Sequence, residues 1–358
     1  QTRQAIRRAK KANPEKDIIV TGCAAQVDPA MFAAMPETSA VVGNVDKYDA
    51  ANFKLGLHSN RPDIRVSDIM RITETAPHMV SSFADRSRAF VEIQNGCDHR
   101  CTFCIIPFGR GDSRSVPAGL VVDQVRALVD KGFQEVVLTG VDVTSYGPDL
   151  PGQPTLGLLI ERILKHVPDL PRLRLSSLDG IEIDDRLFDL LTGEARLMPH
   201  VHLSLQSGDN MILKRMKRRH SREQAIALVE RLKAKRPDIA IGADIIAGFP
   251  TENDAMFANS LAIIDQCDIV HGHIFPYSPK QGTPAAKMPQ LDGNVIKERA
   301  KILRKTVARR AQQWRQTLVG SRQNILAEMS GSAGYAENFA SVRLDGSASR
   351  GQIVDRKR

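Results

Sequence analysis

Short apolar runs alternate with longer amphipathic stretches from residue 89 to residue 276 of this 358-residue chain. Each run is rich in β-branched residues and predicts a buried strand, and each stretch between two runs predicts a helix. Six such strand–helix units predict a parallel α/β barrel or half-barrel, whose functional groups lie at the C-terminal ends of the strands. The predicted strands are 90–94, 135–140, 172–177, 200–206, 239–248 and 268–275, and the predicted helices lie near 119–132, 155–166, 184–193, 210–215, 221–235 and 254–266.

The residues before the barrel region predict part of a smaller α/β domain. Residues 1–12 predict a basic helix, and the apolar runs 18–22 and 39–44 predict two buried strands with a helix at 30–35 between them. The polar residues 56–88 predict an irregular linker to the barrel. Because the first helix has no strand before it, we expect the chain to lack the start of this domain.

The residues after the barrel predict a long basic helix and a small β module. The helix covers 295–318, with eight Lys/Arg and one acidic residue between Lys297 and Arg315. Short alternating runs punctuated by Gly and Ser follow, and they predict a small barrel of the OB or a similar type. Three strands are fewer than the roughly five that close such a barrel, so we expect the module to be incomplete. The three runs are 323–329, 340–346 and 351–357.

The net charge is concentrated at the C-terminal end. The chain has 50 Lys/Arg and 41 Asp/Glu, a formal charge of +9, and residues 297–358 alone hold 14 Lys/Arg against five Asp/Glu. A basic end on a neutral body predicts a polyanionic partner, and a solvated basic surface is the alternative. No apolar run approaches the ~18 residues of a membrane span, so we expect no membrane association.

Three of the five cysteines lie in the loop after the first predicted barrel strand. Cys97, Cys101 and Cys104 form a C-x3-C-x2-C motif. So few cysteines in a chain of this length do not form a disulfide scaffold, and they predict a metal site in a reducing, cytoplasmic compartment. Thiolates are the usual ligands of iron–sulfur clusters, and three thiolates would leave one iron of a cubane cluster open to a substrate.

Zinc is the competing metal for this motif, with His99 or a distant residue as the fourth ligand. Zinc sites of this kind usually include a second C-x2-C or H-x3-H pair, which this sequence lacks. Cys23 and Cys267 stand alone, and Cys267 is most simply a buried core thiol. The spacing favours an iron–sulfur cluster over zinc.

The motif and its flanking residues resemble the radical S-adenosylmethionine (SAM) enzymes, and among them the methylthiotransferases. TGCAAQ near the start is similar to the additional cluster domain of that family, and residues from about 320 are similar to its RNA-binding TRAM module. The resemblance implies an α/β fold with a partial (β/α)6 barrel at 86–316, a partial N-terminal domain at 1–80 and a TRAM-like module at 317–358. It rests on the segments IQNGCDHRCTFCIIPFGRGDSRSVP, LTGVDVTSYG, LRLSSLDGIEI, HLSLQSGDNMILKRMKRRHS, DIIAGFPTE and FPYSPKQGTPAA.

The resemblance also implies the roles of individual residues. Cys97, Cys101 and Cys104 would be the catalytic ligands of a [4Fe–4S] cluster whose open iron binds SAM. Other residues at the strand ends would hold the SAM molecule, although ordinary core packing or turn formation is the alternative for several of them. Asp244 stands where many radical SAM enzymes have glycine. The expected SAM contacts are Phe103, Gly140, Val141, Asp142, Ser177, Gln206, Asp244 and Ile246.

The implied reaction inserts a methylthio group at C2 of the adenine beside the anticodon of tRNA. The segments RG-x-SRS and GVDVTSYG are most similar to the branch of the family that acts on N6-threonylcarbamoyladenosine. The implied partners are the tRNA anticodon stem-loop and an electron donor such as flavodoxin or ferredoxin. The alternatives are the same chemistry on isopentenyladenosine or on a ribosomal protein, and an RNA-binding remnant without chemistry.

A second [4Fe–4S] cluster, which carries the sulfur, is implied by the resemblance. The family binds it with three cysteines of the N-terminal domain, and only Cys23 lies in that part of this chain. We therefore expect Cys23 to be a ligand of an incomplete second cluster, in a fragment of a longer enzyme.

Basic residues near the predicted site suggest contacts with phosphate or carboxylate groups. One group follows the fourth predicted strand, a second lies close behind the cysteines, and a third surrounds two aromatic residues of the C-terminal module, where bases could stack. A solvated surface or ordinary core packing is the alternative for each. The three groups are Lys214, Arg215, Lys217, Arg218 and Arg219; Arg110 and Arg114; and Tyr335 and Phe339 with Arg322 and Arg343.

Overall fold

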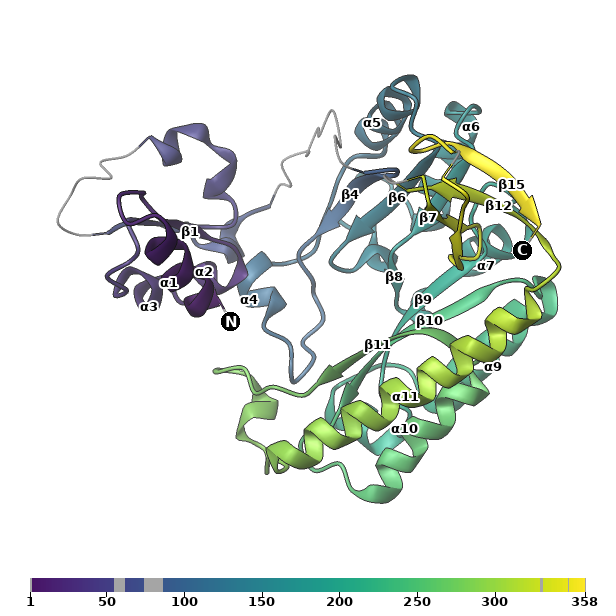
Figure 1. The fold of residues 1–358 in the computed structure, drawn as a ribbon. Coiled ribbons are helices and arrows are strands. Elements are labelled where there is room, and N and C mark those ends of the chain that lie inside the picture. Colours follow the sequence, from purple (N-terminus) through teal and green to yellow (C-terminus); the bar gives the residue numbers. More distant parts are fainter. Residues whose placement is uncertain (1, 55–61, 74–85, 329–330, 347, 358) are drawn as a thin grey trace. The chain divides into compact units, whose positions relative to one another are not determined.

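The computed structural model of the chain describes residues 2–54, 62–73, 86–328, 331–346 and 348–357 (Figure 1). The chain forms two compact units. The first unit contains residues 1–76, 95–100 and 104–114, and the second contains residues 77–94, 101–103 and 115–358. Among the described helices, none combines the length and the apolar character that a membrane crossing requires.

The first unit is built on a three-stranded parallel sheet of order β1-β2-β3. The buried side chains of Ile6, Phe32 and Val41 form its core, so the predicted small α/β unit is confirmed. Its elements are α1 (Thr2–Ala12), β1 (Ile19–Thr21), α2 (Cys23–Val27), α3 (Pro29–Ala33), β2 (Ala40–Val42), β3 (Asp63–Arg65) and α4 (Ile106–Arg110), with single 3-10 turns at Asp46–Tyr48, Ala50–Phe53 and Ile69–Arg71.

The prediction of an irregular segment at 56–88 is wrong for part of that range. Asp63–Arg65 form the strand β3, which pairs with β2 through Ala40 opposite Asp63 and Val42 opposite Arg65. This strand is short and carries two charged side chains, so the sequence has no apolar run to indicate it. Residues 55–61 and 74–85 lie outside the described part of the chain.

The second unit contains the predicted barrel strands. They form two parallel sheets, in which the order is β4-β6-β7 and β8-β9-β10-β11, and the six predicted strands are confirmed within one or two residues, with 172–177 divided into β7 and β8. The strands are β4 (Ala89–Asn95), β6 (Glu135–Gly140), β7 (Arg172–Leu175), β8 (Ser177–Leu178), β9 (His200–Gln206), β10 (Ala240–Ala247) and β11 (Ile269–Pro276), and the two-residue β5 (Arg114–Ser115) lies beside β4.

The predicted helices of the second unit are also present. The first packs on the second and the second on the third, the third packs on the helix at 222–235, and that helix packs on the one at 254–266. Apolar side chains such as Val121, Leu159 and Ile263 are fully buried in the core between helices and strands. The capping box of Ser221 and Gln224 is formed at the start of α9. The helices are α5 (Ala118–Asp130), α6 (Leu156–His166), α7 (Asp185–Gly193), α8 (Asn210–Arg215), α9 (Arg222–Lys235) and α10 (Asp254–Gln266), with 3-10 turns at Val143–Ser145, Gly180–Glu182 and Pro284–Lys287.

The long basic helix α11 (Gly293–Thr317) packs along β11 and α10 (Figure 1). Leu303, Val307 and Trp314 are buried on its inner side. Several of its cations have acidic partners: Arg309 Nη2 lies 2.7 Å from Asp265 Oδ2, and Arg310 pairs with Asp268. Part of the C-terminal charge excess is therefore neutralised by the barrel.

A four-stranded antiparallel sheet of order β14-β13-β12-β15 ends the chain. The prediction of three strands was wrong in number, because β13 has the sequence Ala-Gly-Tyr-Ala and no apolar alternation. A Cβ at Gly334 would lie 2.5 Å from the carbonyl oxygen of Leu326, so glycine allows this close pairing. The strands are β12 (Arg322–Ala327), β13 (Ala333–Ala336), β14 (Ser341–Arg343) and β15 (Ile353–Lys357).

Candidate functional site

The cysteine motif follows β4, and its two ends belong to the first unit. The backbone N–H of Cys97 donates to the carbonyl of Gly111 (3.1 Å), and the N–H of Ser113 donates to Asp98 Oδ1 (2.8 Å). Gly96 has φ +77°, and a Cβ there would lie 1.8 Å from the carbonyl oxygen of Asp112. A glycine is therefore required where the chain turns from the strand into the motif.

The middle of the motif, Cys101–Phe103, belongs to the second unit. The N–H of Thr102 donates to the carbonyl of Met216 (3.1 Å), and its hydroxyl donates to the carbonyl of Arg215 (2.7 Å). Arg218 Nη1 lies 3.7 Å from Cys101 Sγ. These contacts fix the segment to the turn after α8 and place a cation beside a sulfur that would bind iron as a thiolate.

The cysteines differ in accessibility, and the difference follows the predicted roles. Cys97, Cys101 and Cys104 are partly exposed, whereas Cys267 is fully buried. Burial raises the pKa of the Cys267 thiol to about 12, so it stays protonated and is a core residue, as expected. Three accessible sulfurs on one short loop are a donor set that fits an iron–sulfur cluster.

Cys23 lies at the start of α2 in the first unit. Its sulfur accepts hydrogen bonds from Arg110 Nε (3.2 Å) and from Asn44 Nδ2 (3.5 Å). Two donors, one of them a cation, suit a sulfur that carries negative charge. The role of Cys23 as a cluster ligand stays a prediction.

Two predicted SAM contacts, Phe103 and Ile246, lie in one apolar cluster. Ile246 is buried near the end of β10 and packs with Phe249, and Phe103 packs against this cluster with its ring centroid 6.4 Å from that of Phe249. The cluster offers an apolar surface at the C-terminal end of β10, and its member Phe103 lies two residues after Cys101 in the sequence. Such a surface suits the face of a purine.

The segment 140–142 follows β6, and Val141 in it is half-buried. The N–H of Asp142 donates to Gln94 Oε1 (2.8 Å), and its carboxylate accepts from Ser145 Oγ (2.9 Å). A Cβ at Gly140 would lie 2.6 Å from the carbonyl oxygen of Gln94. Gly140 is therefore needed for the close approach of β6 to β4, and sequence reasoning did not identify Gln94.

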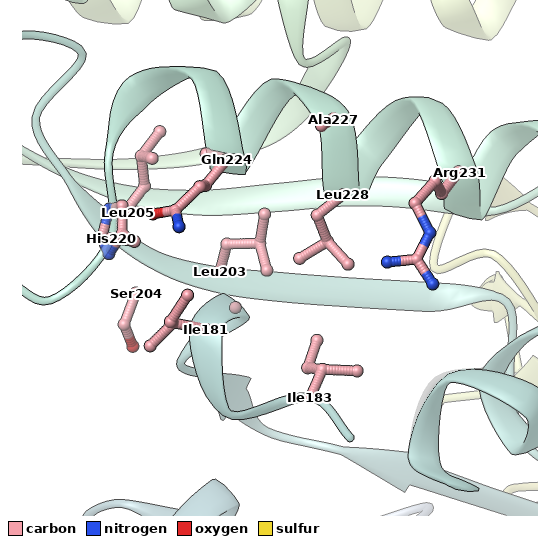
Figure 2. A pocket seen from close by; sticks show the side chains of 12 residues that line it. Ile181, Ile183, Leu203, Ser204, Leu205, His220, Gln224, Ala227, Leu228 and Arg231 are labelled. Atoms are coloured by element: carbon pink, nitrogen blue, oxygen red, sulfur yellow. The ribbon is translucent and has the colours of Figure 1, made fainter. Parts of the chain in front are cut away.

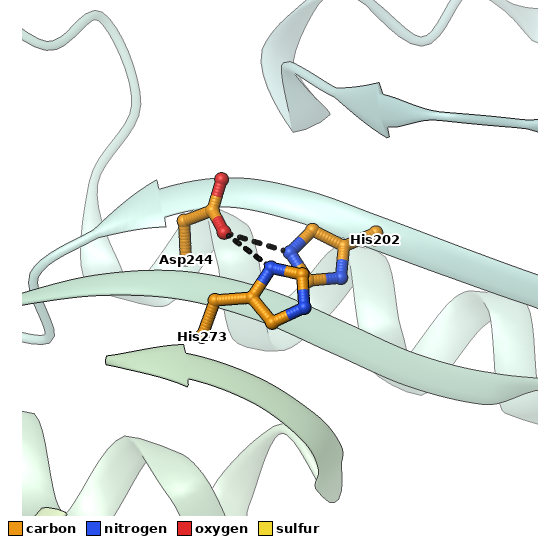
Figure 3. A group of neighbouring side chains, drawn as sticks. All are labelled: His202, Asp244 and His273. Atoms are coloured by element: carbon orange, nitrogen blue, oxygen red, sulfur yellow. Dashed lines mark hydrogen bonds and ion pairs between the residues drawn. The ribbon is translucent and has the colours of Figure 1, made fainter. Parts of the chain in front are cut away.

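Asp244 joins two histidines from the neighbouring strands (Figure 3). Its Oδ1 lies 2.9 Å from His202 Nε2 on β9 and 3.1 Å from His273 Nδ1 on β11. The three ligand atoms lie within 4.8 Å of one another, so they could hold a divalent metal. The hydrogen bonds among them account for the arrangement without a metal, and SAM binding by Asp244 stays a prediction.

Gln206 stands at the end of its strand, as expected, whereas Ser177 does not end the predicted strand 172–177, because β7 stops at Leu175. Ser177 begins β8 and pairs in register with His202 of β9. Gln206 is the last residue of β9, and its φ of +70° turns the chain toward α8. A positive φ is uncommon for a residue other than glycine and often marks a functional position.

A cavity of about 280 Å³ lies on the other face of β9, beneath α9 (Figure 2). Leu203 and Leu205 of the strand face it, together with Ile183 and Leu228. Because side chains alternate along a strand, this face is opposite the one that carries His200 and His202. The cavity is largely apolar and does not belong to the candidate site.

The floor of the barrel is a buried ionic cluster. Glu135 is completely buried, and Arg88 Nε (3.1 Å), Arg172 Nη1 (3.7 Å) and Arg174 Nε (3.0 Å) surround its carboxylate. Burial alone would raise the pKa of Glu135, but the three guanidinium groups hold it below the usual value. Arg88 also pairs with Glu328 (2.9 Å), which connects the floor to the C-terminal sheet.

Above this floor, two histidines are held in their neutral form. Burial lowers the pKa of His200 well below its usual value and lowers that of His271 to about 4. The pKa of His271 is 6.5 in the unfolded chain and about 4 in the folded chain. Between these values the unfolded chain binds the proton and the folded chain does not, so the folded state loses stability as the pH falls through this range. We expect His271 to cost about 2 kcal/mol of unfolding free energy between pH 7 and pH 5.

Urea unfolding at pH 7 and pH 5 measures this loss. His271→Phe removes the titrating group and should reduce the pH-dependent loss by about 2 kcal/mol. The same substitution at His166, on the exposed end of α6, should leave it unchanged. A pH dependence in His271→Phe equal to that of the parent chain would show that this histidine is not held neutral.

Several basic residues that were predicted to bind phosphate have structural roles instead. The side chain of Arg218 is 7% exposed, and its Nη2 donates to Asp179 Oδ2 (2.9 Å) and to the carbonyl of Ser204 (2.8 Å). Arg114 is buried, and its guanidinium donates to the carbonyls of Arg110 and Asp112 (both 2.8 Å). Arg215 and Arg219 also have partners in the protein: Arg215 donates to Thr251, and Arg219 pairs with Glu182. Lys214 and Lys217 are exposed.

The aromatic pair of the C-terminal sheet is turned inward. The rings of Tyr335 and Phe339 stack with centroids 4.7 Å apart, and Arg88 lies over both rings. Arg174 lies 4.8 Å from the centroid of Phe339. These contacts favour the alternative of core packing for both rings, and stacking on bases stays a prediction. Arg343 is exposed, and Arg322 is exposed and pairs with Asp355.

Comparison with known proteins shows which chains have similar sequences. Residues 91–264 match the model of the radical SAM superfamily. A threonylcarbamoyladenosine tRNA methylthiotransferase MtaB from Rickettsia prowazekii is 52% identical over 99% of this chain and 83% of its own length. The MtaB of Aquifex aeolicus is 36% identical over 99% of this chain and 86% of its own. A tRNA-2-methylthio-N(6)-dimethylallyladenosine synthase from Staphylococcus saprophyticus is 32% identical, over 98% of this chain and 68% of its own.

Proposed function

This chain belongs to the MtaB family of radical SAM tRNA methylthiotransferases, and on that basis we propose that it transfers a methylthio group to C2 of N6-threonylcarbamoyladenosine in tRNA. The observation that carries the proposal is the 52% identity over 99% of the chain to a relative of that name. Radical SAM enzymes use a [4Fe–4S] cluster and SAM, and the accessible cysteine motif after β4 supports the same cofactors here.

We assign the cluster to Cys97, Cys101 and Cys104. When bound, the cluster supplies the electron for reductive cleavage of SAM. The protein's own part is to hold and orient SAM. Phe103 and Ile246 offer an apolar surface to its adenine, and Gly140 allows the end of β6 to lie close to Gln94 of β4. The proposed set of SAM contacts is completed by residues that lie on the barrel strands or directly after them, namely Val141, Asp142, Ser177, Gln206 and Asp244.

We propose that the C-terminal sheet is a TRAM-like module that binds the tRNA anticodon stem-loop. Its support is the antiparallel order β14-β13-β12-β15 and the exposed cations Arg322 and Arg343 on it. The proposed domains are 1–80, 86–316 and 317–358. An electron donor such as flavodoxin or ferredoxin and a cytoplasmic location follow from the proposed reaction, because reduced cysteines and tRNA are found together there.

Nucleoside analysis of tRNA tests the proposal. In a bacterial strain that lacks its own enzyme, expression of this chain should restore 2-methylthio-N6-threonylcarbamoyladenosine, and Cys101→Ala should restore none. Restoration of the methylthio group on dimethylallyladenosine instead would assign the chain to the reaction of its Staphylococcus relative. Unmodified tRNA together with tight RNA binding would indicate an RNA-binding chain without chemistry.

A further inference from the structure

A cavity of about 570 Å³ lies inside the barrel of the second unit, between the strand ends and the ionic floor. Residues of six strands line it, among them Phe90 of β4, Val137 of β6 and Arg174 of β7. His200 and His202 of β9 and His271 and His273 of β11 also face it. The histidines of each strand are two residues apart, so the alternation of side chains turns both members of a pair to the same face.

Several buried polar atoms on this cavity have no hydrogen-bond partner in the described part of the chain. They are both ring nitrogens of His200, Nε2 of His271, Nη1 of Arg174 and Oγ of Ser176. His200 is 8% exposed and Arg174 is 3% exposed. Buried polar groups in folded proteins are almost always paired, so a cluster of five unpaired atoms around one cavity indicates a ligand with complementary polar groups.

The charges on the cavity indicate the chemistry of this ligand. Glu135 accepts hydrogen bonds from Nε and Nη2 of Arg174, which leaves Nη1 of this guanidinium group directed away from that carboxylate. His200 and His271 are neutral. The ring of His200 can donate one hydrogen bond and accept another, whereas His271 already bonds to the backbone of Asn338 and has only Nε2 left for a ligand. The cavity therefore offers one cationic donor for a carboxylate and several neutral groups for hydroxyl, amide or carbonyl partners.

We propose that this cavity receives the threonylcarbamoyl group on N6 of the substrate adenine, with Arg174 Nη1 on its carboxylate and His200, His271 and Ser176 on its hydroxyl and urea-like atoms. The inference rests on the proposed function and names the residues that select this substrate. A dimethylallyl group has no polar atoms and would leave all these groups unpaired. Sites built to hydrogen-bond a substrate reject analogues that lack the polar group by factors of up to about 10⁴.

Binding of anticodon stem-loop RNA to the cluster-loaded full chain tests the inference. Three RNAs that differ at one position, with N6-threonylcarbamoyladenosine, N6-dimethylallyladenosine or adenosine, are compared without reductant, so that no turnover occurs. The parent chain should bind the first RNA about tenfold or more tightly than the other two. His200→Leu should weaken binding of the first RNA about tenfold and leave the affinity for the other two unchanged.

His166→Leu, the same substitution on the exposed end of α6, is the matched control and should retain the preference. Ser176→Ala removes a single hydroxyl and should reduce the preference severalfold; it decides the test if His200→Leu does not fold. Equal affinities of the parent chain for the three RNAs would overturn the inference, as would a preference that neither variant changes. Because no product is formed, this outcome is separate from the tRNA analysis, whose failure would instead overturn the proposed reaction.

Discussion

Cys101→Ala is expected to abolish iron binding by the motif and, with it, the cleavage of SAM. The motif supplies three sulfurs, and a [4Fe–4S] cluster that keeps one iron open for SAM needs all three as thiolates. An alanine at position 101 has no ligand atom. The iron that Cys101 would bind therefore loses its protein ligand, in addition to the iron that is left open for SAM. We expect the brown colour of the anaerobically reconstituted chain to disappear and 5′-deoxyadenosine formation to fall to the level measured without iron.

Cys267→Ala is the matched control for this prediction. Its thiol is fully buried in the core of the second unit and stays protonated, so its removal should leave the cluster and the cleavage of SAM unchanged. It should lower only the stability, by about 1 kcal/mol, because a small apolar group is lost from the core. A full cluster in Cys101→Ala would contradict the assignment of the ligands.

Glu135→Gln is expected to cost about 3–5 kcal/mol of unfolding free energy. The substitution removes the carboxylate that Arg88, Arg172 and Arg174 share, and their guanidinium groups would remain together in the barrel floor without it. Breaking a buried ion pair by removing one partner leaves uncompensated charge, which costs far more than the loss of an exposed pair. Urea unfolding at pH 7 measures the change.

Glu161→Gln provides the comparison on the surface. Glu161 pairs with Arg186, and both side chains are close to half exposed, so its loss should cost less than about 1 kcal/mol. If the two substitutions cost the same, the cluster around Glu135 would not support the barrel. A loss confined to Glu135→Gln would show that the floor is a main source of its stability.

The arrangement of strands and helices in the barrel could be predicted because each strand is a short segment rich in apolar residues, separated from the next by a helical segment. β6 and β9 were predicted to the residue, since both faces of these strands are largely buried and the runs end at glycine or glutamine. The short strands β3 and β13 could not be predicted. They are held by backbone pairing and contain charged or small residues, so they leave no periodic signal.

The predicted strand ends indicated where the candidate site lies. The sequence did not indicate which groups the charged residues near this site contact. The sequence places Arg218 in a run of basic residues that is typical of a phosphate-binding surface. Its burial against Asp179 depends on how the turn after α8 packs on the barrel, which no local pattern encodes. The structural role of Arg114 was missed for the same reason, because its partners are backbone carbonyls.

The histidines of the barrel were overlooked although the sequence carries a signal for them. His200 and His202 are spaced two apart in one predicted strand, and His271 and His273 in another. Polar side chains at alternate positions of a buried parallel strand are unusual, and they indicate that one face of the strand meets something other than an apolar core. This spacing is therefore sufficient to indicate a polar cavity inside the barrel.

The central claim is that the cysteine loop binds an iron–sulfur cluster that is open to SAM. Metal and sulfide analysis of the anaerobically reconstituted chain, with electron paramagnetic resonance of the reduced protein, tests it most directly. We expect about four iron and four sulfide per chain and a spectrum that changes when SAM is added. A colourless protein that contains zinc, or a spectrum that SAM leaves unchanged, would contradict the claim.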